Sequence, residues 1–551
     1  MAKKRKSKEK IILRAGDTIG SMAAEDDHKF LKNCFVDLPI LKNLRDMDCS
    51  QNILIGRTGS GKSAILWDFE QNCKNVSRLD PTEASFNYLA NSGMIEYLDN
   101  LGVDLSVFYE YLWKHILCIH IIRECLDVKT NDTYKIFLKK ISNFAKKDKR
   151  YDEVKSYLTE SDNKFWINVE EVARSNIDSL TSKIAAKAGL SISDLKANTE
   201  FNKKKSTSSE IQIKQIGHEI VSNLQIQKLT KTIDTLSDLV NEKPIKFYIL
   251  IDDLEENWGG EKIQYPLIRA LLKSLRKFQQ FDNLKIIVAI REDIYESTLR
   301  SIKHKPFQSD KFDSKLCRIK WPPNKLHAVI DRRLNHLFKK QYEKKDVGVK
   351  DVLPLTINRQ KISTYLASKT LQRPRDIISF INEIFANHVE NRAIPLSAKQ
   401  VLSTEIIYSR KRIDALHEEW KSCHPNLEQY IKILKLFKDG STIQDLDNKR
   451  IENLILTLAE KEPEDNIEGL AIKAFETMNS DTIFDLKTAL LCCLYKVGVL
   501  GFKFEPTSPI QYCYDYQAII NPNEIDLETK FYIHPMFKPV FQMNERKIKA
   551  A

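Results

Sequence analysis

Residues 52–72, NILIGRTGSGKSAILWDFEQN, contain the motif on which the fold prediction depends. The apolar run Asn52–Ile55 predicts a buried strand, and Lys62–Asn72 has the residue spacing and composition of a helix. Between them, residues 56–63 match the pattern G-x-x-x-x-G-K-S/T in full. The chain has 16 glycines, and three of them fall within this octapeptide. A strand, a glycine-rich loop and a helix in this order predict a phosphate-binding loop.

We expect this loop to hold the phosphates of a nucleotide. Glycine lets backbone N–H groups turn inward around an anion, and the helix that begins there adds positive potential. Lys62 can reach the β and γ phosphates, and the Ser63 hydroxyl can bind Mg²⁺. The alternative is a plain glycine turn that opens a helix and binds nothing. The expected binding residues are Gly56, Arg57, Thr58, Gly59, Ser60, Gly61, Lys62 and Ser63.

A second apolar run, Phe247–Ile251, is followed at once by acidic residues. Because the carboxyl ends of parallel strands lie at one edge of a sheet, we expect these acids at the edge that carries the phosphate loop. Asp252 would bind Mg²⁺, directly or through water. Asp253 is the first candidate for the base that orients the attacking water, and Glu255 is the second. A solvated acidic helix cap is the alternative interpretation.

Two arginines further along the chain are candidates for contact with a γ phosphate. Arg291 follows the apolar run Leu284–Ile290, where a cation could contact the phosphate or pair with Glu292 or Asp293. Arg375 lies in the segment LQRPRDIISFINEI, in which Pro374 is typical of the first position of a helix. Arg375 would therefore lie on the first turn of a lid helix and reach phosphates across an interdomain cleft, or lie on the surface.

Composition and charge exclude several classes of protein. Hydrophobic residues make up 42% of the 551 residues and charged residues 29%, and no stretch approaches the about 20 apolar residues that cross a bilayer. The ten cysteines include no CxxC pair and no signal-peptide segment follows the basic start, so we expect a cytoplasmic protein. The first ten residues contribute six basic residues and one acidic residue to the formal charge of +12, so composition alone does not predict nucleic-acid binding.

Strands that alternate with helices predict an α/β fold with a parallel αβα sheet. The segment from about residue 104 to residue 240 is helical and charged, which indicates a large helical insertion. Helices followed by short β-rich pieces near the C-terminus predict a winged helix. The expected parts are a basic tail (1–29), the first part of a P-loop NTPase core (30–103), a helical insertion (104–240), the second part of the core (241–322), a helical lid (323–395) and a C-terminal helical and winged-helix-like region (396–551).

Four segments in order, GRTGSGKSA, FYILIDDLEENW, IIVAIRED and LQRPRDIISFINEI, resemble the AAA+/STAND group of P-loop ATPases. The resemblance is to bacterial ATPases of phage-defence and mobile-element loci, and more distantly to origin-recognition ATPases. It covers residues 30–100 and 240–390. It implies Walker A at Lys62 and Ser63, Walker B at Asp252 and Asp253, sensor 1 at Arg291 and sensor 2 at Arg375.

This resemblance implies a switch that binds ATP and Mg²⁺ and couples hydrolysis to conformation, homo-oligomer assembly or an effector protein, in anti-phage defence and without a membrane. No glutamate directly follows Asp252, which leaves the base open between Asp253 and Glu255 and implies slow turnover. His534 could touch an ADP phosphate or lie in the core. The alternative function is a DNA-binding AAA+ ATPase of origin-recognition or transposition-regulator type. Arginine fingers acting on a second copy have the candidates Arg269, Arg276 and Arg332.

Overall fold

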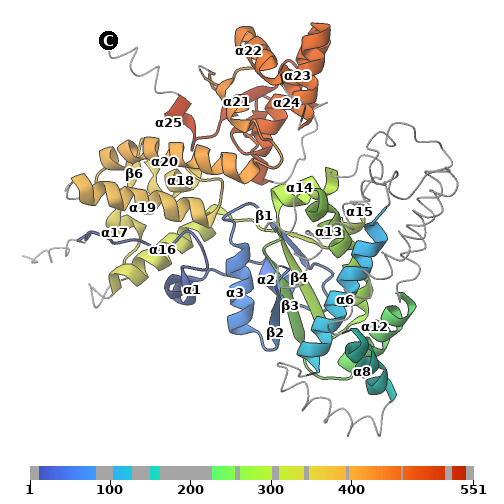
Figure 1. The fold of residues 1–551 in the computed structure, drawn as a ribbon. Helices are drawn as coiled ribbons and strands as arrows, with labels where there is room; N and C mark the ends of the chain where they lie inside the picture. The colour runs from blue at the N-terminus through green and yellow to red at the C-terminus, as the bar shows by residue number, and fades with distance from the viewer. Residues whose placement is uncertain are drawn as a thin grey trace, which may run out of the picture. The chain divides into compact units, whose positions relative to one another are not determined.

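The computed structural model describes residues 12–81, 104–126, 149–161, 226–254, 261–300, 310–339, 346–391, 396–435, 437–460, 463, 465–515 and 524–541. The chain divides into two compact units, shown in Figure 1. The helical unit comprises the described parts of 1–41, 56–65 and 318–551, and the sheet unit those of 42–55 and 66–317. The basic residues at positions 3–10 lie outside the described residues.

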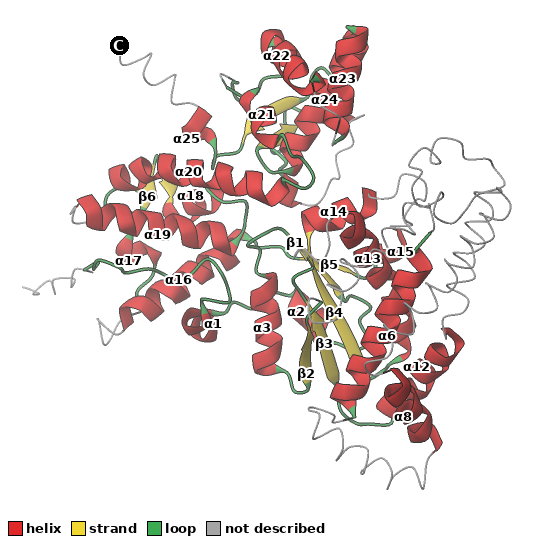
Figure 2. Ribbon diagram, in the orientation of Figure 1, coloured by secondary structure: helices red, strands yellow, loops and turns green. Residues whose placement is uncertain are grey.

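The sheet unit is built on a five-stranded parallel sheet in the order β2-β3-β4-β1-β5 (Figure 2). β3 pairs in parallel with both β2 and β4, so that Ile249 lies opposite Ser77 on one side and Ile286 on the other. Every residue of β3 is buried, as expected for a parallel strand covered on both faces. The predicted parallel α/β sheet is therefore confirmed. Its strands are β1 (Ile53–Gly56), β2 (Val76–Leu79), β3 (Phe247–Ile251), β4 (Leu284–Arg291) and β5 (Leu316–Arg318).

Helices cover both faces of the sheet because alternate strand residues point to opposite sides. On one face, Tyr248 meets Phe69 of α3 (Lys62–Asn72), with ring centroids 5.4 Å apart. On the other face, Ile249 and Ile251 belong to a hydrophobic core that also contains residues of four helices (Figure 1). These helices are α6 (Ser106–Cys125), α8 (Lys149–Ser161), α12 (Ile226–Asn241) and α13 (Glu261–Ser274).

The helices expected in an insertion share the core of the sheet. Trp113 of α6 is fully buried, and its indole N–H donates to the carbonyl of Leu267 in α13 at 2.9 Å. His115 of α6 and the hydroxyl of Tyr157 in α8 form a 2.6 Å hydrogen bond. Burial, together with the charge of Arg123, lowers the pKa of His115 to about 3, so the imidazole is neutral at physiological pH. The described part of this segment is therefore integral to the sheet unit.

A buried lysine joins β4 to the loop before β1. The ammonium of Lys285 donates to the carbonyls of Asn43 at 2.9 Å, Asp46 at 2.6 Å and Cys49 at 2.9 Å. We expect Lys285→Met to lower the free energy of unfolding by about 3 kcal/mol, because three carbonyls lose their donor. Urea denaturation measures this, with Lys42→Met at an exposed position as the control, expected to change it by less than about 0.5 kcal/mol. A loss below about 1 kcal/mol for Lys285→Met would contradict the prediction.

The helical unit contains the segment predicted as a lid and the C-terminal region. The helix expected after LQR begins at Pro374, as α19 (Pro374–Asn391). Near the C-terminus, an antiparallel pair of strands places Leu500 of β8 opposite Ile533 of β9. Among the described residues, none of the helices has the length and apolarity needed to cross a bilayer. The main elements are α1 (His28–Cys34), α16 (Pro323–Lys339), α18 (Ile362–Ser368), α19, α20 (Ala398–Trp420), α21 (Leu427–Lys432), α22 (Asn448–Ala459), α23 (Asn466–Thr477), α24 (Ser480–Lys496), β8 (Leu500–Lys503), β9 (Lys530–Ile533) and α25 (Lys538–Phe541).

Candidate phosphate-binding site

The loop between β1 and α3 has the backbone that an anion site needs. Gly59 and Gly61 have φ angles of 74° and 97°, in the left-handed region that favours glycine. A Cβ at Gly59 would lie 2.5 Å from the Cβ of Arg375, so a side chain does not fit there. Helix α3 begins at Lys62, and the first amides of a helix have no acceptor within it. The loop can therefore offer backbone N–H groups and the positive end of a helix dipole to an anion.

The side chains of Lys62 and Trp321 donate to carbonyls of this loop. The ammonium of Lys62 donates to the carbonyl of Gly56 at 3.1 Å, and the residue is 7% exposed. The indole N–H of Trp321 donates to the carbonyl of Ser60 at 2.7 Å. The sequence analysis did not identify this anchor. Ser63, the expected Mg²⁺ ligand, lies on the first turn of α3 and is half-buried.

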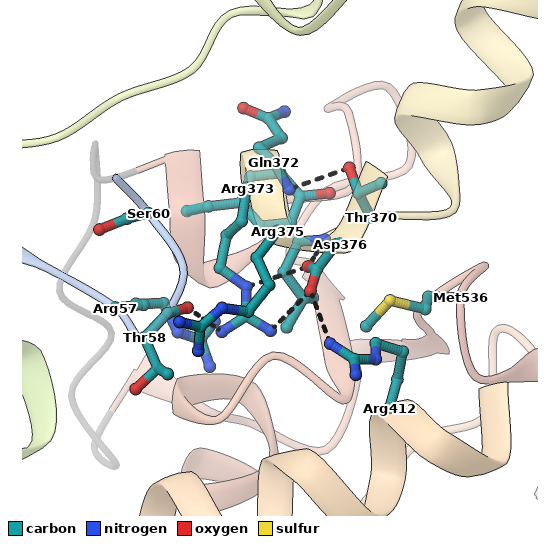
Figure 3. Close-up of polar contacts among 12 residues, drawn as sticks. Arg57, Thr58, Ser60, Thr370, Gln372, Arg373, Arg375, Asp376, Arg412 and Met536 are labelled. Atoms are coloured by element: carbon teal, nitrogen blue, oxygen red, sulfur yellow. Dashed lines mark hydrogen bonds and ion pairs between the residues drawn. The ribbon is translucent and has the colours of Figure 1, made fainter. Parts of the chain in front are cut away.

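Arg373 is the main residue of the site that the sequence analysis missed. Its guanidinium donates to the carbonyl of Thr58 at 2.9 Å and to Oε2 of Glu419 at 2.7 Å, as Figure 3 shows in part. It also binds Asp376, from Nε at 2.9 Å and from Nη2 at 3.2 Å. The side chain is buried, and its neighbouring carboxylates outweigh desolvation and raise its pKa. Arg373 therefore joins the loop between β1 and α3 to α19 and α20.

The two carboxylates of this network are buried and charged. Glu419 accepts from the backbone N–H of Thr58 at 3.2 Å in addition to its bond with Arg373. Burial disfavours its charged form, but the guanidinium groups of Arg373 and Arg57 hold its pKa below the ordinary value. Burial likewise opposes the ionisation of Asp376, but Arg373 and Arg412 keep its pKa low. The Asp376 carboxylate and the Arg412 guanidinium are 3.5 Å apart (Figure 3).

Arg375, the arginine expected on the lid helix, lies beside the loop on the first turn of α19. Its backbone N–H donates to the carbonyl of Gly59 at 3.3 Å, and its Nε donates to the carbonyl of Met22 at 3.1 Å. Burial, followed by the charge of Arg373, lowers the pKa of Arg375. An anion bound nearby would favour the charged form of this guanidinium.

Positive charge exceeds negative charge around the loop. The network contains four guanidinium groups and two carboxylates, which leaves a formal excess of two positive charges. Such an excess favours a phosphate group, because bonds between a guanidinium and a phosphate are charge-assisted. The members are Arg57, Arg373, Arg375, Arg412, Asp376 and Glu419.

The expected acidic residues lie in the sheet unit, at the carboxyl end of β3. Asp252 is 5% exposed. Asp253 is exposed and has a φ of 57°, a left-handed conformation that costs a non-glycine residue about 1 kcal/mol or more. Glu255 lies outside the described residues. Aspartate adopts this region more readily than most residues, and five other described non-glycine residues share it, so the angle alone does not assign a function to Asp253.

Arg291 ends β4 and forms the ion pair that was the alternative to phosphate contact. Its Nη2 and Nε lie 2.7 Å and 3.1 Å from the two carboxylate oxygens of the buried Asp293. Among the candidate arginine fingers, Arg269 is buried, Arg276 is exposed and Arg332 donates to the carbonyl of Phe35.

His534 lies in the core of the helical unit. Its Nδ1 accepts from the backbone N–H of Met536 at 3.1 Å, and its Nε2 lies 3.1 Å from the hydroxyl of Tyr514. The residue has no exposed surface. Its buried position agrees with the core alternative that the sequence left open.

Burial lowers the pKa of His534 to about 3, from an ordinary value of 6.5. Between pH 6.5 and 3, the imidazole of His534 binds a proton in the unfolded chain but stays neutral in the folded chain. Its contribution to the free energy of unfolding therefore decreases as the pH falls from 6.5 toward 3. We expect the stability advantage of the wild type over His534→Gln to shrink by about 1.4 kcal/mol per pH unit in this window. Urea unfolding of both proteins at several pH values measures this change. A stability difference that stays constant over the window would contradict the lowered pKa of His534.

Comparisons with known proteins find a matching family model and a similar protein. Residues 324–417 match a family described as the FunZ-associated C-terminal helical domain. The chain is also similar to a protein of Escherichia coli (strain K12) named "Putative transposon gamma-delta 80.3 kDa protein". The two are 22% identical over 557 residues, which cover 96% of this chain and 67% of the relative. The matched segment contains nearly all of α16, all of α18 and α19, and most of α20. It therefore includes Arg373 and Arg375.

Proposed function

We propose that this protein binds ATP at residues 56–63, hydrolyses it slowly and couples nucleotide state to conformation, assembly or partner binding. One observation carries the proposal: a loop with left-handed Gly59 and Gly61 opens α3 among an excess of guanidinium groups. Backbone amides, Lys62 and Arg375 are the donors that a triphosphate requires. The further assignment to an AAA+/STAND-like switch that acts in anti-phage defence depends on the sequence resemblance.

The proposal gives each candidate residue a role. Ser63 and Asp252 would hold Mg²⁺, because hydroxyl and carboxylate oxygens are the ligands that this ion prefers. Mg²⁺ neutralises charge on the phosphates when it is bound. Asp253 or Glu255 would orient the attacking water. Arg375 would contact the γ phosphate from the lid helix, while Arg291 is held by Asp293.

A second candidate function has support from the comparison with the transposon-associated protein. Under this alternative, the chain is a DNA-binding ATPase of the transposition-regulator type, and the C-terminal helices with β8 and β9 contact the duplex as a winged helix does. Binding to duplex DNA would weaken steeply with salt, because bound cations are released from the phosphates. Retention of this binding after deletion of residues 1–10 would favour the alternative over simple attraction to the tail.

Calorimetric titration of the full chain tests the ATP proposal. Mg-ATP and Mg-ADP are expected to bind one site per chain, and inorganic phosphate to bind far more weakly, since it lacks most of the phosphate contacts. Release of inorganic phosphate from ATP, measured over hours, tests slow hydrolysis. Absence of any heat with either nucleotide would overturn the proposal. Transfer of phosphate to another molecule, in place of its release, would indicate a phosphotransferase.

A further inference from the structure

Arg57 is buried at a position where the phosphate-loop pattern allows any residue. It is 4% exposed, and its guanidinium donates to the carbonyl of Val497 at 2.5 Å and to the sulfur of Cys513 at 3.1 Å. The guanidinium also lies over the ring of Trp420, 5.6 Å from its centroid. An arginine is buried this fully only when its charge and donors have partners. The phosphate loop is therefore attached to the C-terminal part of the helical unit through one side chain.

The carbonyl that Arg57 binds lies at the end of α24. The helix closes with two bonds, from the N–H of Gly498 to the carbonyl of Tyr495 at 2.9 Å and from the N–H of Val499 to the carbonyl of Leu494 at 2.8 Å. With Gly498 at a φ of 91°, this is a Schellman motif. The carbonyls of the last helical turn lack donors within the helix, and a cation there also lies at the negative end of the helix dipole. Arg57 is thus a cap for α24.

Two residues beside Arg57, Gly498 and Glu419, leave room for its guanidinium and contact it. A Cβ at Gly498 would lie 2.9 Å from Nη1 of Arg57, so glycine provides room for the guanidinium as well as the left-handed turn. Glu419 lies 3.7 Å from Nε of Arg57 and accepts from the N–H of Thr58. Arg57 and Thr58, two consecutive residues of the loop, therefore both contact residues outside it. A change in the shape of the loop must disturb the contact of Arg57 with Val497 and that of Thr58 with Glu419.

We propose that Arg57 is a positioning residue that couples anion binding at the loop to the turn between α24 and β8. A phosphate offers Arg57 a charged acceptor, and a bond between two oppositely charged groups is stronger than its bond to the neutral carbonyl of Val497. Binding therefore draws the guanidinium from Val497 and loosens the end of α24. Coupling between two sites is reciprocal, so loss of the cap also changes the affinity of the loop for the anion. The identity of the anion as a nucleotide rests on the proposed function.

Hydrogen exchange of the full chain, with and without saturating Mg-ADP, tests this coupling at residues 494–503. In the wild type, ADP is expected to speed exchange of these amides at least about fivefold. Arg57→Gln is expected to exchange at the faster rate without nucleotide, with no further change when ADP saturates it. Arg450→Gln is the matched control, because Arg450 also donates to a backbone carbonyl of this unit, that of Lys435. It should keep the wild-type response to ADP.

The outcomes separate this inference from the proposed function. If titration shows that ADP binds and exchange at 494–503 does not change, the coupling is overturned and ATP binding stands. Unaltered protection of this segment in Arg57→Gln, without nucleotide, overturns the cap. If neither ADP nor inorganic phosphate binds the wild type, both proposals fail. A response in Arg57→Lys that matches the wild type would show that charge suffices, and would overturn the need for a guanidinium.

Discussion

Replacing Glu419 with glutamine is expected to lower the free energy of unfolding by about 3 to 5 kcal/mol, the cost of breaking a buried ion pair from one side. The carboxylate lies 2.7 Å from Arg373 and 3.7 Å from Arg57, and the three side chains are 4% to 7% exposed. Glutamine keeps the shape of the side chain but leaves two buried guanidinium groups without this counter-charge. Urea denaturation followed by circular dichroism measures the loss.

Glu418 supplies a matched control, because it is the preceding residue of the same helix and is exposed. Glu418→Gln should change stability by less than about 0.5 kcal/mol. The pH dependence adds a second check. Burial opposes ionisation of Glu419, but Arg373 and Arg57 keep its pKa below 4.5, so the stabilisation is present above pH 4.5 and is lost as the pH falls through the lower pKa. The difference between wild type and Glu419→Gln should narrow only in that acidic range. A difference already absent at neutral pH would contradict the ion-pair account.

Three strands of the sheet, β1, β3 and β4, and the loop could be predicted because local patterns specify them, whereas β2 and β5 were not predicted. The apolar runs before residue 56 and before Asp252 are long enough to identify buried strands, and both appear as β1 and β3. The predicted helix over 62–72 is α3, with the same bounds. Glycine crowding identified the left-handed positions, since few other residues adopt a positive φ. These features depend on residues within one short segment.

The network around the loop could not be predicted, because its members are far apart in the sequence. Glu419 reaches Thr58 across 361 residues, and nothing in its own helix distinguishes it from Glu418. Arg373 lies only two residues before Arg375, the arginine that the sequence analysis selected as a candidate on the lid helix. Proline at 374 identified where the helix begins but not which arginine would be buried. For Arg291, the pairing with Asp293 was foreseen as an alternative, because it needs only neighbouring residues.

Lys62→Ala is expected to weaken Mg-ATP binding at least about 100-fold, if the proposed function is correct. The ammonium now donates to the carbonyl of Gly56 at 3.1 Å, a bond to a neutral acceptor that a phosphate can replace with a stronger, charge-assisted one. Bonds of this kind contribute about 1.5 to 3 kcal/mol each, and 3 kcal/mol corresponds to about 100-fold in affinity. Calorimetric titration of both proteins with Mg-ATP measures the ratio.

Folding and binding effects are expected to differ in size in this variant, because the bond from Lys62 to the carbonyl of Gly56 has a neutral acceptor, whereas a phosphate in the complex is a charged acceptor. The free energy of unfolding should fall by only about 1 kcal/mol. Lys74→Ala is the control, since Lys74 is exposed just beyond α3 and carries the same charge near the same helix. It should bind Mg-ATP like the wild type, because an exposed charge at that distance is largely screened by salt. Binding by Lys62→Ala within about threefold of the wild type would mean that the loop does not hold phosphate through this lysine, and the nucleotide would have to bind elsewhere.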